Sequence, residues 1–317
     1  GGSRVLAHGD MSRHVLGIQA VTADPDATVI GNLSGLRKDN TGPDATRLLI
    51  GSGGAFGVIT AVAVALTPVP AQRATALVGP LPDTDAIQLL AQLRERLGTG
   101  LSAFEVMCPA AVEAGLSIAS PSGPVDPGRD PEVLVLAEAS GANGCGDSLV
   151  DALSSVRING RQGPPPGSLL PTSEAWALRH AITEGLRSRG EVLGFDLSVR
   201  PRDLPALRAS VRALVLEQGA EMFVADFGHW GDGGIHANVV IPDSTGTDAE
   251  PGLLRSRVYA LVTGRFGGSW SAEHGVGPLN ADEWAATVGS TEAATLRAFA
   301  DITDPLRILG HPGLPFG

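Results

Sequence analysis

The chain has 317 residues and a formal net charge of −11, with 43% hydrophobic and 18% charged residues. This composition excludes a disordered chain, and the length suggests two domains. The acidic balance argues against a nucleic-acid or anionic-membrane surface, which would need a basic face. No apolar run approaches the roughly 20 residues of a transmembrane helix. We therefore expect no nucleic-acid partner and no membrane span.

Cysteine usage indicates the compartment. The two cysteines, Cys108 and Cys145, have no C-x-x-C spacing, so the sequence predicts neither a disulfide framework nor a sulfur metal site. No signal peptide opens the chain. These features predict a cytoplasmic protein.

The first 68 residues are glycine-rich and predict only short elements. Strands are expected at 15–21, 27–30 and 58–66, and the last is an apolar run expected to be buried. The prolines of "TPVPAQR", residues 67–73, predict a linker.

Beyond the linker, strands and helices alternate. Strands are predicted at 74–78, 101–107, 132–139, 192–199, 221–228 and 235–241. Helices are predicted at 83–97, 110–119, 146–156, 202–217, 251–266, 281–288 and 291–302. A further helix is predicted to begin at an N-cap, Ser173. The proline-rich segments 121–131 and 161–171 are predicted to be loops. This alternation predicts an α+β domain with helices on one face of an antiparallel sheet.

The segment "GHWGDGGIHAN", residues 228–238, places His229 and His236 at either end of a glycine-rich turn. If the flanking strands pair, both imidazoles lie at the same end of one sheet. A two-histidine metal site needs a carboxylate to complete it, and "SAEHGVG", residues 271–277, offers Glu273 beside His274. The simpler interpretation is a hairpin that happens to begin and end in histidine, and both interpretations remain open at this point.

These two motifs together resemble the metal and active-site motifs of FAD-linked oxidases of the vanillyl-alcohol oxidase superfamily. The resemblance is greatest to the D-lactate, glycolate and D-2-hydroxyglutarate dehydrogenase branch. Four further segments agree with it, at residues 1–21, 37–60, 176–183 and 304–313. The resemblance covers nearly the whole chain. It implies the second half of a PCMH-type FAD-binding domain (1–68), a ferredoxin-like antiparallel cap domain (69–300) with helices towards its end, and a return segment to the FAD domain (301–317).

The resemblance also implies roles for individual residues. His229, His236 and Glu273 would hold a divalent metal, zinc or manganese, and His274 would be the general base. Asn238 would contact the substrate. Arg179 and Thr183 would bind the substrate carboxylate, which suits their i, i+4 spacing on a helix and the bidentate guanidinium. The simpler interpretation of Arg179 is a solvated helix arginine.

The implied cofactor is FAD. The flavin contacts implied by the resemblance are Gly1, Gly2, Asn40, Gly42, Gly51, Gly57, Val58, Ile59 and His311. The "GSGGAFG" segment at 51–57 fits neither a P-loop nor a G-x-G-x-x-G fingerprint, so it disfavours a Rossmann site, whereas its glycines allow close approach to a flat cofactor. The implied reaction oxidises a small D-2-hydroxy acid to the 2-oxo acid and passes electrons to an unidentified acceptor. A homodimer is left open.

The sequence also departs from the family pattern. The half of the FAD domain that carries the pyrophosphate loop does not precede Gly1, so we expect either a fragment or a half supplied by another chain. Gly53 and Gly194 stand where the family pattern has a glutamate and a lysine. These departures motivate an alternative, a catalytically silent cap domain that serves as a scaffold or interaction module. A metal-assisted hydrolase using Glu273 and His274 is a third hypothesis, with no explanation for residues 1–68.

Overall fold

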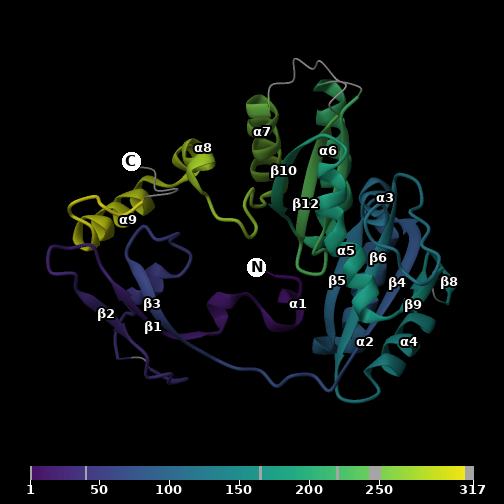
Figure 1. Cartoon of the computed structure of the whole chain (residues 1–317), viewed down its shortest axis with the longest axis horizontal. Coiled ribbons are helices and arrows are strands. Elements are labelled where there is room, and N and C mark those ends of the chain that lie inside the picture. Colours follow the sequence, from purple (N-terminus) through teal and green to yellow (C-terminus); the bar gives the residue numbers. More distant parts are fainter. Residues whose placement is uncertain (1, 40, 164–165, 219–220, 243–250, 311–317) are drawn as a thin grey trace. The chain divides into compact units, whose positions relative to one another are not determined.

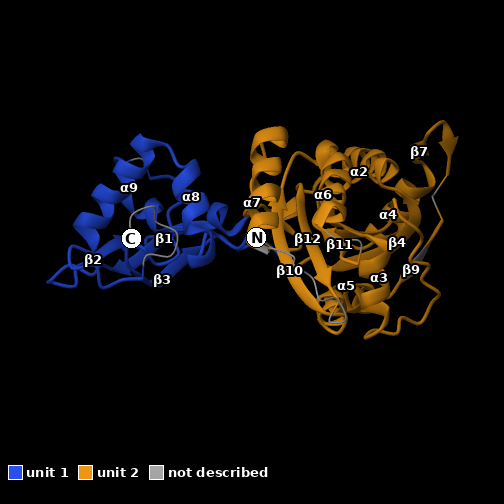
Figure 2. Ribbon diagram, turned by 90° about the horizontal axis from the view of Figure 1, so that it is seen from above, with its two compact units in different colours: residues 1, 10–68, 273–317 blue, residues 2–9, 69–272 orange. Residues whose placement is uncertain are grey.

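The computed structural model describes residues 2–39, 41–163, 166–218, 221–242 and 251–310. The chain forms two compact units, coloured separately in Figure 2. Unit 1 contains residues 10–68 and the segment from 273 onward, and unit 2 contains residues 2–9 and 69–272. The first described residues therefore group with unit 2, and the segment that begins at residue 273 groups with unit 1.

Unit 1 is built on a three-stranded antiparallel sheet in the order β2-β1-β3. Its strands are β1 (Val15–Val21), β2 (Val29–Asn32) and β3 (Val58–Val64), and its helices are α8 (Ala281–Thr287) and α9 (Ser290–Thr303), with single 3₁₀ turns at Met11–Arg13, Ala45–Leu49 and Pro278–Asn280. A small core joins the sheet to α9, where the rings of Phe56 and Phe299 meet edge-to-face with centroids 4.9 Å apart. Two distant segments of the sequence thus share one core.

The strand β3 is not buried, so the expectation for residues 58–66 is wrong. It lies at the edge of the sheet, and Val58, Val62 and Val64 are 58%, 45% and 43% exposed. A continuous apolar run predicts burial only when other elements cover both faces of the strand. Within the described part of unit 1 the hydrophobic core is small and lies beside β1.

Unit 2 is built on a seven-stranded sheet in the order β10-β12-β11-β5-β6-β4-β9, in which all neighbours pair antiparallel (Figure 1). The strands are β4 (Gln72–Pro82), β5 (Leu101–Met107), β6 (Glu132–Gly141), β9 (Gly167–Leu170), β10 (Glu191–Ser198), β11 (Phe223–Gly228) and β12 (Gly234–Ile241). A two-stranded ribbon of β7 (Arg157–Ile158) and β8 (Arg161–Gln162) stands apart from it.

The predicted loop at 161–171 is wrong in part, because β9 forms within it. Gly167 pairs with Val78 at the sheet edge, where a Cβ on residue 167 would stand 2.5 Å from the carbonyl oxygen of Leu77. Prolines are tolerated beside an edge strand, since only one side of that strand needs ladder hydrogen bonds. The prolines of residues 161–171 therefore do not prevent part of this segment from forming a strand.

Helices cover both faces of this sheet, so the expectation of one covered face is also wrong. The helices are α1 (Val5–His8), α2 (Asp83–Leu97), α3 (Pro109–Leu116), α4 (Cys145–Ser154), α5 (Thr172–Arg187), α6 (Leu204–Gln218) and α7 (Pro251–Ala260), the last continued by a π-helical turn at Leu261–Arg265. Arg208 of α6 binds Asp226, whereas Arg179 of α5 stacks on Phe227. Successive residues of a strand point to opposite faces, so α5 and α6 lie on opposite sides.

The helix α5 packs closely on α3. A Cβ at Gly185 would stand 2.0 Å from the carbonyl oxygen of Ala114, so only glycine permits this approach. The helix begins at Thr172, and Ser173 lies in its first turn rather than at the N-cap as predicted. This packing fixes the height of α5 above the sheet, and with it the position of Arg179. Among the described residues, no helix has the length and apolarity needed to cross a membrane.

Candidate metal centre

The hairpin between β11 and β12 brings the two motif histidines together. Phe227 pairs with His236, which confirms the predicted strand pairing. The His229 carbonyl oxygen accepts hydrogen bonds from the backbone N–H groups of Asp232, Gly233 and Gly234, at 3.1, 3.2 and 3.1 Å. Gly233 has φ +98°, and a Cβ there would lie 2.1 Å from the carbonyl oxygen of Val199. Glycine is therefore required at position 233 of this turn.

The two imidazoles point their Nε2 atoms at one another. These atoms are 3.4 Å apart, and the rings lie 85° from coplanar. Two ring nitrogens bound to one tetrahedral zinc, at bond lengths of about 2.0–2.1 Å, stand roughly 3.3–3.4 Å apart. The observed spacing therefore suits two ligands of a single metal ion.

A carboxylate lies behind each imidazole. The Nδ1 atom of His229 is 2.5 Å from Oε1 of Glu105, and Nδ1 of His236 is 3.5 Å from Oδ1 of Asp196. Metal-binding histidines commonly donate the second ring N–H to such a group, which sets the ring orientation and leaves the other nitrogen as the ligand. Glu105 is therefore at hydrogen-bonding distance from His229, whereas Asp196 lies at ion-pair distance from His236.

The chain returns to the histidines just before Glu273. Ser271 forms a parallel bridge with Asp196, and the Ala272 N–H donates to the Asp196 carbonyl oxygen at 3.0 Å. Glu273 follows directly after this anchor, and His274 follows Glu273. One ligand atom from each of His229, His236 and Glu273 lies within 4.8 Å of the others.

Arg179 shares a carboxylate with His229. Its Nε donates to Oε2 of Glu105 at 2.8 Å, and its guanidinium lies 4.3 Å from the ring centroid of Phe227. Arg179 is only 7% exposed, so the solvated arginine of the simpler interpretation is wrong. Within the described residues, this is the only protein hydrogen bond of Arg179, which leaves both terminal Nη groups for a ligand.

The charge state of Glu105 follows from its neighbours. Burial acts most strongly, raising the pKa of its carboxyl, but the hydrogen bond from His229 and the charge of Arg179 oppose burial, and the pKa is lowered overall. Glu105 is 1% exposed and is therefore a buried anion with two fixed partners.

The other two predicted substrate residues lie in different settings. Asn238 is on the same face of β12 as His236, and its Nδ2 donates to the carbonyl oxygens of Ala225 and His236 at 3.3 and 3.4 Å. Gly194 pairs with it from β10. Thr183 is exposed on α5, whereas Arg179 one turn earlier is buried, so their shared helix face lies across the boundary between core and solvent.

The predicted flavin contacts lie mainly in unit 1. Those placed there are Gly42, Gly51, Gly57, Val58 and Ile59, while Gly2 belongs to unit 2 and Gly1, Asn40 and His311 fall outside the described residues.

The surroundings of these glycines differ. Gly57 has a local reason to be glycine, because a Cβ there would stand 2.9 Å from the Val21 carbonyl oxygen. Gly51 has φ +78° and no atom within 4 Å of its Cβ position, so it borders open space. Gly42 lines a polar cavity of about 340 Å³ with Arg37 and Arg47.

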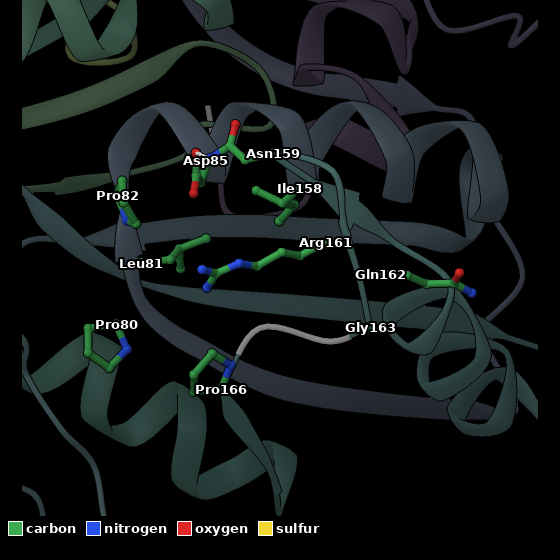
Figure 3. Close-up of a pocket in the computed structure, with 10 residues that line it drawn as sticks. All are labelled: Pro80, Leu81, Pro82, Asp85, Ile158, Asn159, Arg161, Gln162, Gly163 and Pro166. Carbon is green, nitrogen blue, oxygen red and sulfur yellow. Dashed lines mark hydrogen bonds between the residues drawn. The ribbon is translucent and has the colours of Figure 1, made fainter.

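A larger cavity, of about 590 Å³, lies in unit 2 (Figure 3). It is formed by the end of β4 and the β7–β8 ribbon, and Arg161 extends across it towards Leu81. Asn159 donates to Asp85 at 2.8 Å on its rim. None of the predicted site residues lines this cavity.

Sequence reasoning missed the two carboxylates behind the histidines. The signal was available, because "LSAFEVM" (101–107) carries a single charge in a predicted strand, and all seven of its residues are buried. "LGFDLS" (193–198) carries Asp196 in the same way. A lone acidic residue in an apolar strand requires a partner, since unpaired buried charge is costly.

Comparison with known proteins identifies the family. Residues 69–313 match the family described as FAD linked oxidases, C-terminal domain. The chain belongs to this family. It is 35% identical to the D-2-hydroxyglutarate dehydrogenase, mitochondrial, of Rattus norvegicus over 284 residues, covering 87% of the chain and 51% of the relative. It is 31% identical to the D-2-hydroxyglutarate dehydrogenase of Xanthomonas citri pv. viticola (strain LMG 965 / NCPPB 2475 / ICMP 3867 / CFBP 7660), covering 100% of the chain and 66% of the relative.

Solved structures agree in fold. The chain resembles 4-ethylphenol oxidase from Gulosibacter chungangensis with a TM-score of 0.62 at 16% identity, covering 98% of the chain and 67% of that structure. It resembles p-cresol methylhydroxylase with a TM-score of 0.61 at 15% identity, covering 96% of the chain and 65% of that structure. These findings confirm the predicted family and fold class. The chain spans about half the length of the mammalian relatives it matches.

Proposed function

We propose that this chain is the substrate- and metal-binding part of an FAD-dependent oxidoreductase that oxidises a D-2-hydroxy acid to the 2-oxo acid. D-2-hydroxyglutarate, named in its relatives, is the first substrate to test, followed by D-lactate and glycolate. A divalent metal, zinc or manganese, would be held by His229, His236 and Glu273. An electron acceptor, a homodimer and a cytoplasmic location remain predictions.

One observation carries the proposal. The Nε2 atoms of His229 and His236 face each other at 3.4 Å, and the carboxylate that supports His229 also binds Arg179. A 2-hydroxy acid carries a hydroxyl and a carboxylate on adjacent carbons. Metal-binding groups and a fixed guanidinium, linked through one carboxylate, match that pair of functional groups.

Each residue then has a defined task. Arg179 and Thr183 bind the substrate carboxylate, and Asn238 contacts the substrate beside His236. His274 removes the proton from the 2-hydroxyl, a task suited to an imidazole near neutral pH. A bound metal would lower the pKa of that hydroxyl, and bound FAD would accept the hydride from C2.

The flavin side rests on fewer observations. FAD is the cofactor named by the matching family. Gly51 borders open space, and Val58 and Ile59 are 58% and 43% exposed. This surface has room for a flat cofactor or for the additional polypeptide present in longer relatives. We propose that these residues contribute to the FAD site once that polypeptide is present.

The test is the visible spectrum of the full-length gene product before and after anaerobic addition of each 2-hydroxy acid. We expect flavin absorption that is bleached by one of them. A protein without flavin, or a flavin that no 2-hydroxy acid bleaches, would favour the alternative of a catalytically silent cap domain serving as a scaffold.

A further inference from the structure

The carboxylate of Glu105 links two groups that the proposed reaction uses separately. Its Oε1 lies 2.5 Å from Nδ1 of His229, and its Oε2 accepts from Nε of Arg179 at 2.8 Å. His229 lies in the β11–β12 hairpin, Glu105 on β5 and Arg179 on α5. Their side chains are 10%, 1% and 8% exposed, respectively. One carboxylate thus orients an imidazole and a guanidinium in the protein interior.

We infer that Glu105 is a positioning residue that fixes both the tautomer of His229 and the spacing between the metal ligand and Arg179; this inference rests on the proposed function. An ionised carboxylate only accepts hydrogen bonds. The proton of a neutral His229 therefore sits on Nδ1, and the lone pair of Nε2 faces His236. Without Glu105, either ring nitrogen can carry the proton, and metal binding must first select the correct tautomer.

The same carboxylate sets the orientation of Arg179. With Nε held by Glu105 and Cζ lying 4.3 Å from the centroid of the Phe227 ring, the guanidinium is held at two points, and the two Nη groups have a fixed direction. A glutamine at position 105 offers one oxygen and one NH₂ group. It can accept from His229 or from Arg179, but not from both, because its NH₂ group would face a second donor.

The chain offers a matched control in Glu138. Its side chain is 0% exposed, and it lies on β6, next to β5 and on the same sheet face as Glu105. It also pairs with an arginine, Arg4, through bonds of 2.8 and 3.0 Å, and it accepts from Ser102 and Trp176. Its described hydrogen bonds include no histidine. Glu138→Gln therefore removes a comparable buried charge without touching the metal centre.

The first experiment is a Co²⁺ titration of the full chain, followed by visible absorption, for wild type, Glu105→Gln and Glu138→Gln. Co²⁺ takes the same nitrogen and oxygen ligands as zinc and absorbs visible light. We expect Glu105→Gln to weaken Co²⁺ binding by about 10- to 100-fold, the usual effect of losing a carboxylate behind a metal-binding histidine. Glu138→Gln should bind as wild type does. Equal affinities in all three proteins, or equal losses in both variants, would overturn the inference.

The second experiment reads the tautomer directly and needs neither metal nor activity. The ¹⁵N chemical shifts of His229 in the metal-free protein distinguish a proton on Nδ1 from one on Nε2. We expect Nδ1–H in wild type and in Glu138→Gln, and a mixture in Glu105→Gln. An unchanged tautomer in Glu105→Gln would overturn the role of Glu105. Failure of the wild type to bind Co²⁺ would instead count against the metal in the proposed function, with the tautomer measurement still deciding the inference.

Discussion

Two apolar strands of similar length, β12 in unit 2 and β3 in unit 1, differ in what surrounds them. β12 lies inside a seven-stranded sheet, and six of its eight residues are buried. β3 lies at the edge of a three-stranded sheet, and none of its residues is fully buried. The strand that carries His236 is held on both sides, whereas the strand that carries the predicted flavin contacts Val58 and Ile59 is open.

In the proposed function, these two strands belong to different parts of the site, the metal side and the flavin side. On the metal side, each histidine has a carboxylate partner supplied by a neighbouring strand of the same sheet. On the flavin side, apolar residues face solvent, and the longer relatives contain a further stretch of polypeptide. We therefore expect metal binding to be a property of this chain, and flavin retention to require more of the protein.

The largest expected effect comes from the histidines themselves. His229→Ala should abolish stoichiometric metal binding and lower kcat/KM of the flavin-loaded full-length enzyme by roughly 10²–10⁴-fold, since a metal supplies several kcal/mol of charge stabilisation. Metal analysis of the purified variant and steady-state kinetics with the bleaching substrate check this. Activity within about threefold of wild type would contradict a catalytic role for this centre.

Core and edge positions should differ strongly in stability. Leu136 is fully buried on β6, and Leu136→Ala should lower the free energy of unfolding by about 2–5 kcal/mol. Val62 on β3 is 45% exposed, and its change to alanine should alter the free energy of unfolding of this chain by less than about 0.5 kcal/mol. Urea unfolding of both variants measures the contrast, and a large loss from Val62→Ala would mean that β3 is covered in solution.

Acid stability should depend on Glu138. Burial acts most strongly to raise the pKa of its carboxyl, but the bond from Arg4 and those from Ser102 and Trp176 lower it overall. A lowered folded-state pKa adds stability above the unfolded value of about 4.3, and that stability is lost as the pH falls through the folded value. Glu138→Gln should therefore cost about 1–3 kcal/mol near pH 7 and less near pH 3. If Glu138→Gln lowered the free energy of unfolding equally at both pH values, the result would contradict a stabilising ion pair between Glu138 and Arg4.

The smallest effect concerns the two thiols. Burial raises the pKa of Cys108 to about 12, and Cys108 is 0% exposed, so it should not react with a thiol reagent in the native protein at pH 8. Cys145 is partly exposed and should react first. One thiol should be titrated natively and two after denaturation, and rapid labelling of Cys108 would indicate opening of the sheet beneath α3.

The sequence predicted the features that local pattern determines. The order of most strands and helices, the β11–β12 hairpin and the proximity of the His229 and His236 imidazoles all follow from alternation and glycine placement. Partners distant in the sequence could not be derived in this way. Glu105 precedes His229 by 124 residues, and their contact depends on β5 pairing with β11.

Two features that the sequence did not predict have a common physical origin. Burial of β3 was inferred from its apolar run, but burial depends on what packs against a strand rather than on its own residues. The segment at residues 2–9 docks on unit 2 because Arg4 reaches the buried Glu138 on β6, 134 residues away. Both outcomes are set by tertiary contacts that a window of sequence does not contain.

The most direct test of the account is a Co²⁺ titration of the wild-type chain, monitored by its visible absorption and repeated with His236→Ala. The facing Nε2 atoms predict one equivalent of bound Co²⁺ with the absorption of a low-coordinate nitrogen and oxygen site, lost in the variant. A wild-type chain that leaves Co²⁺ in its hexa-aqua form, or a variant that binds it equally well, would show that the two histidines only close a hairpin.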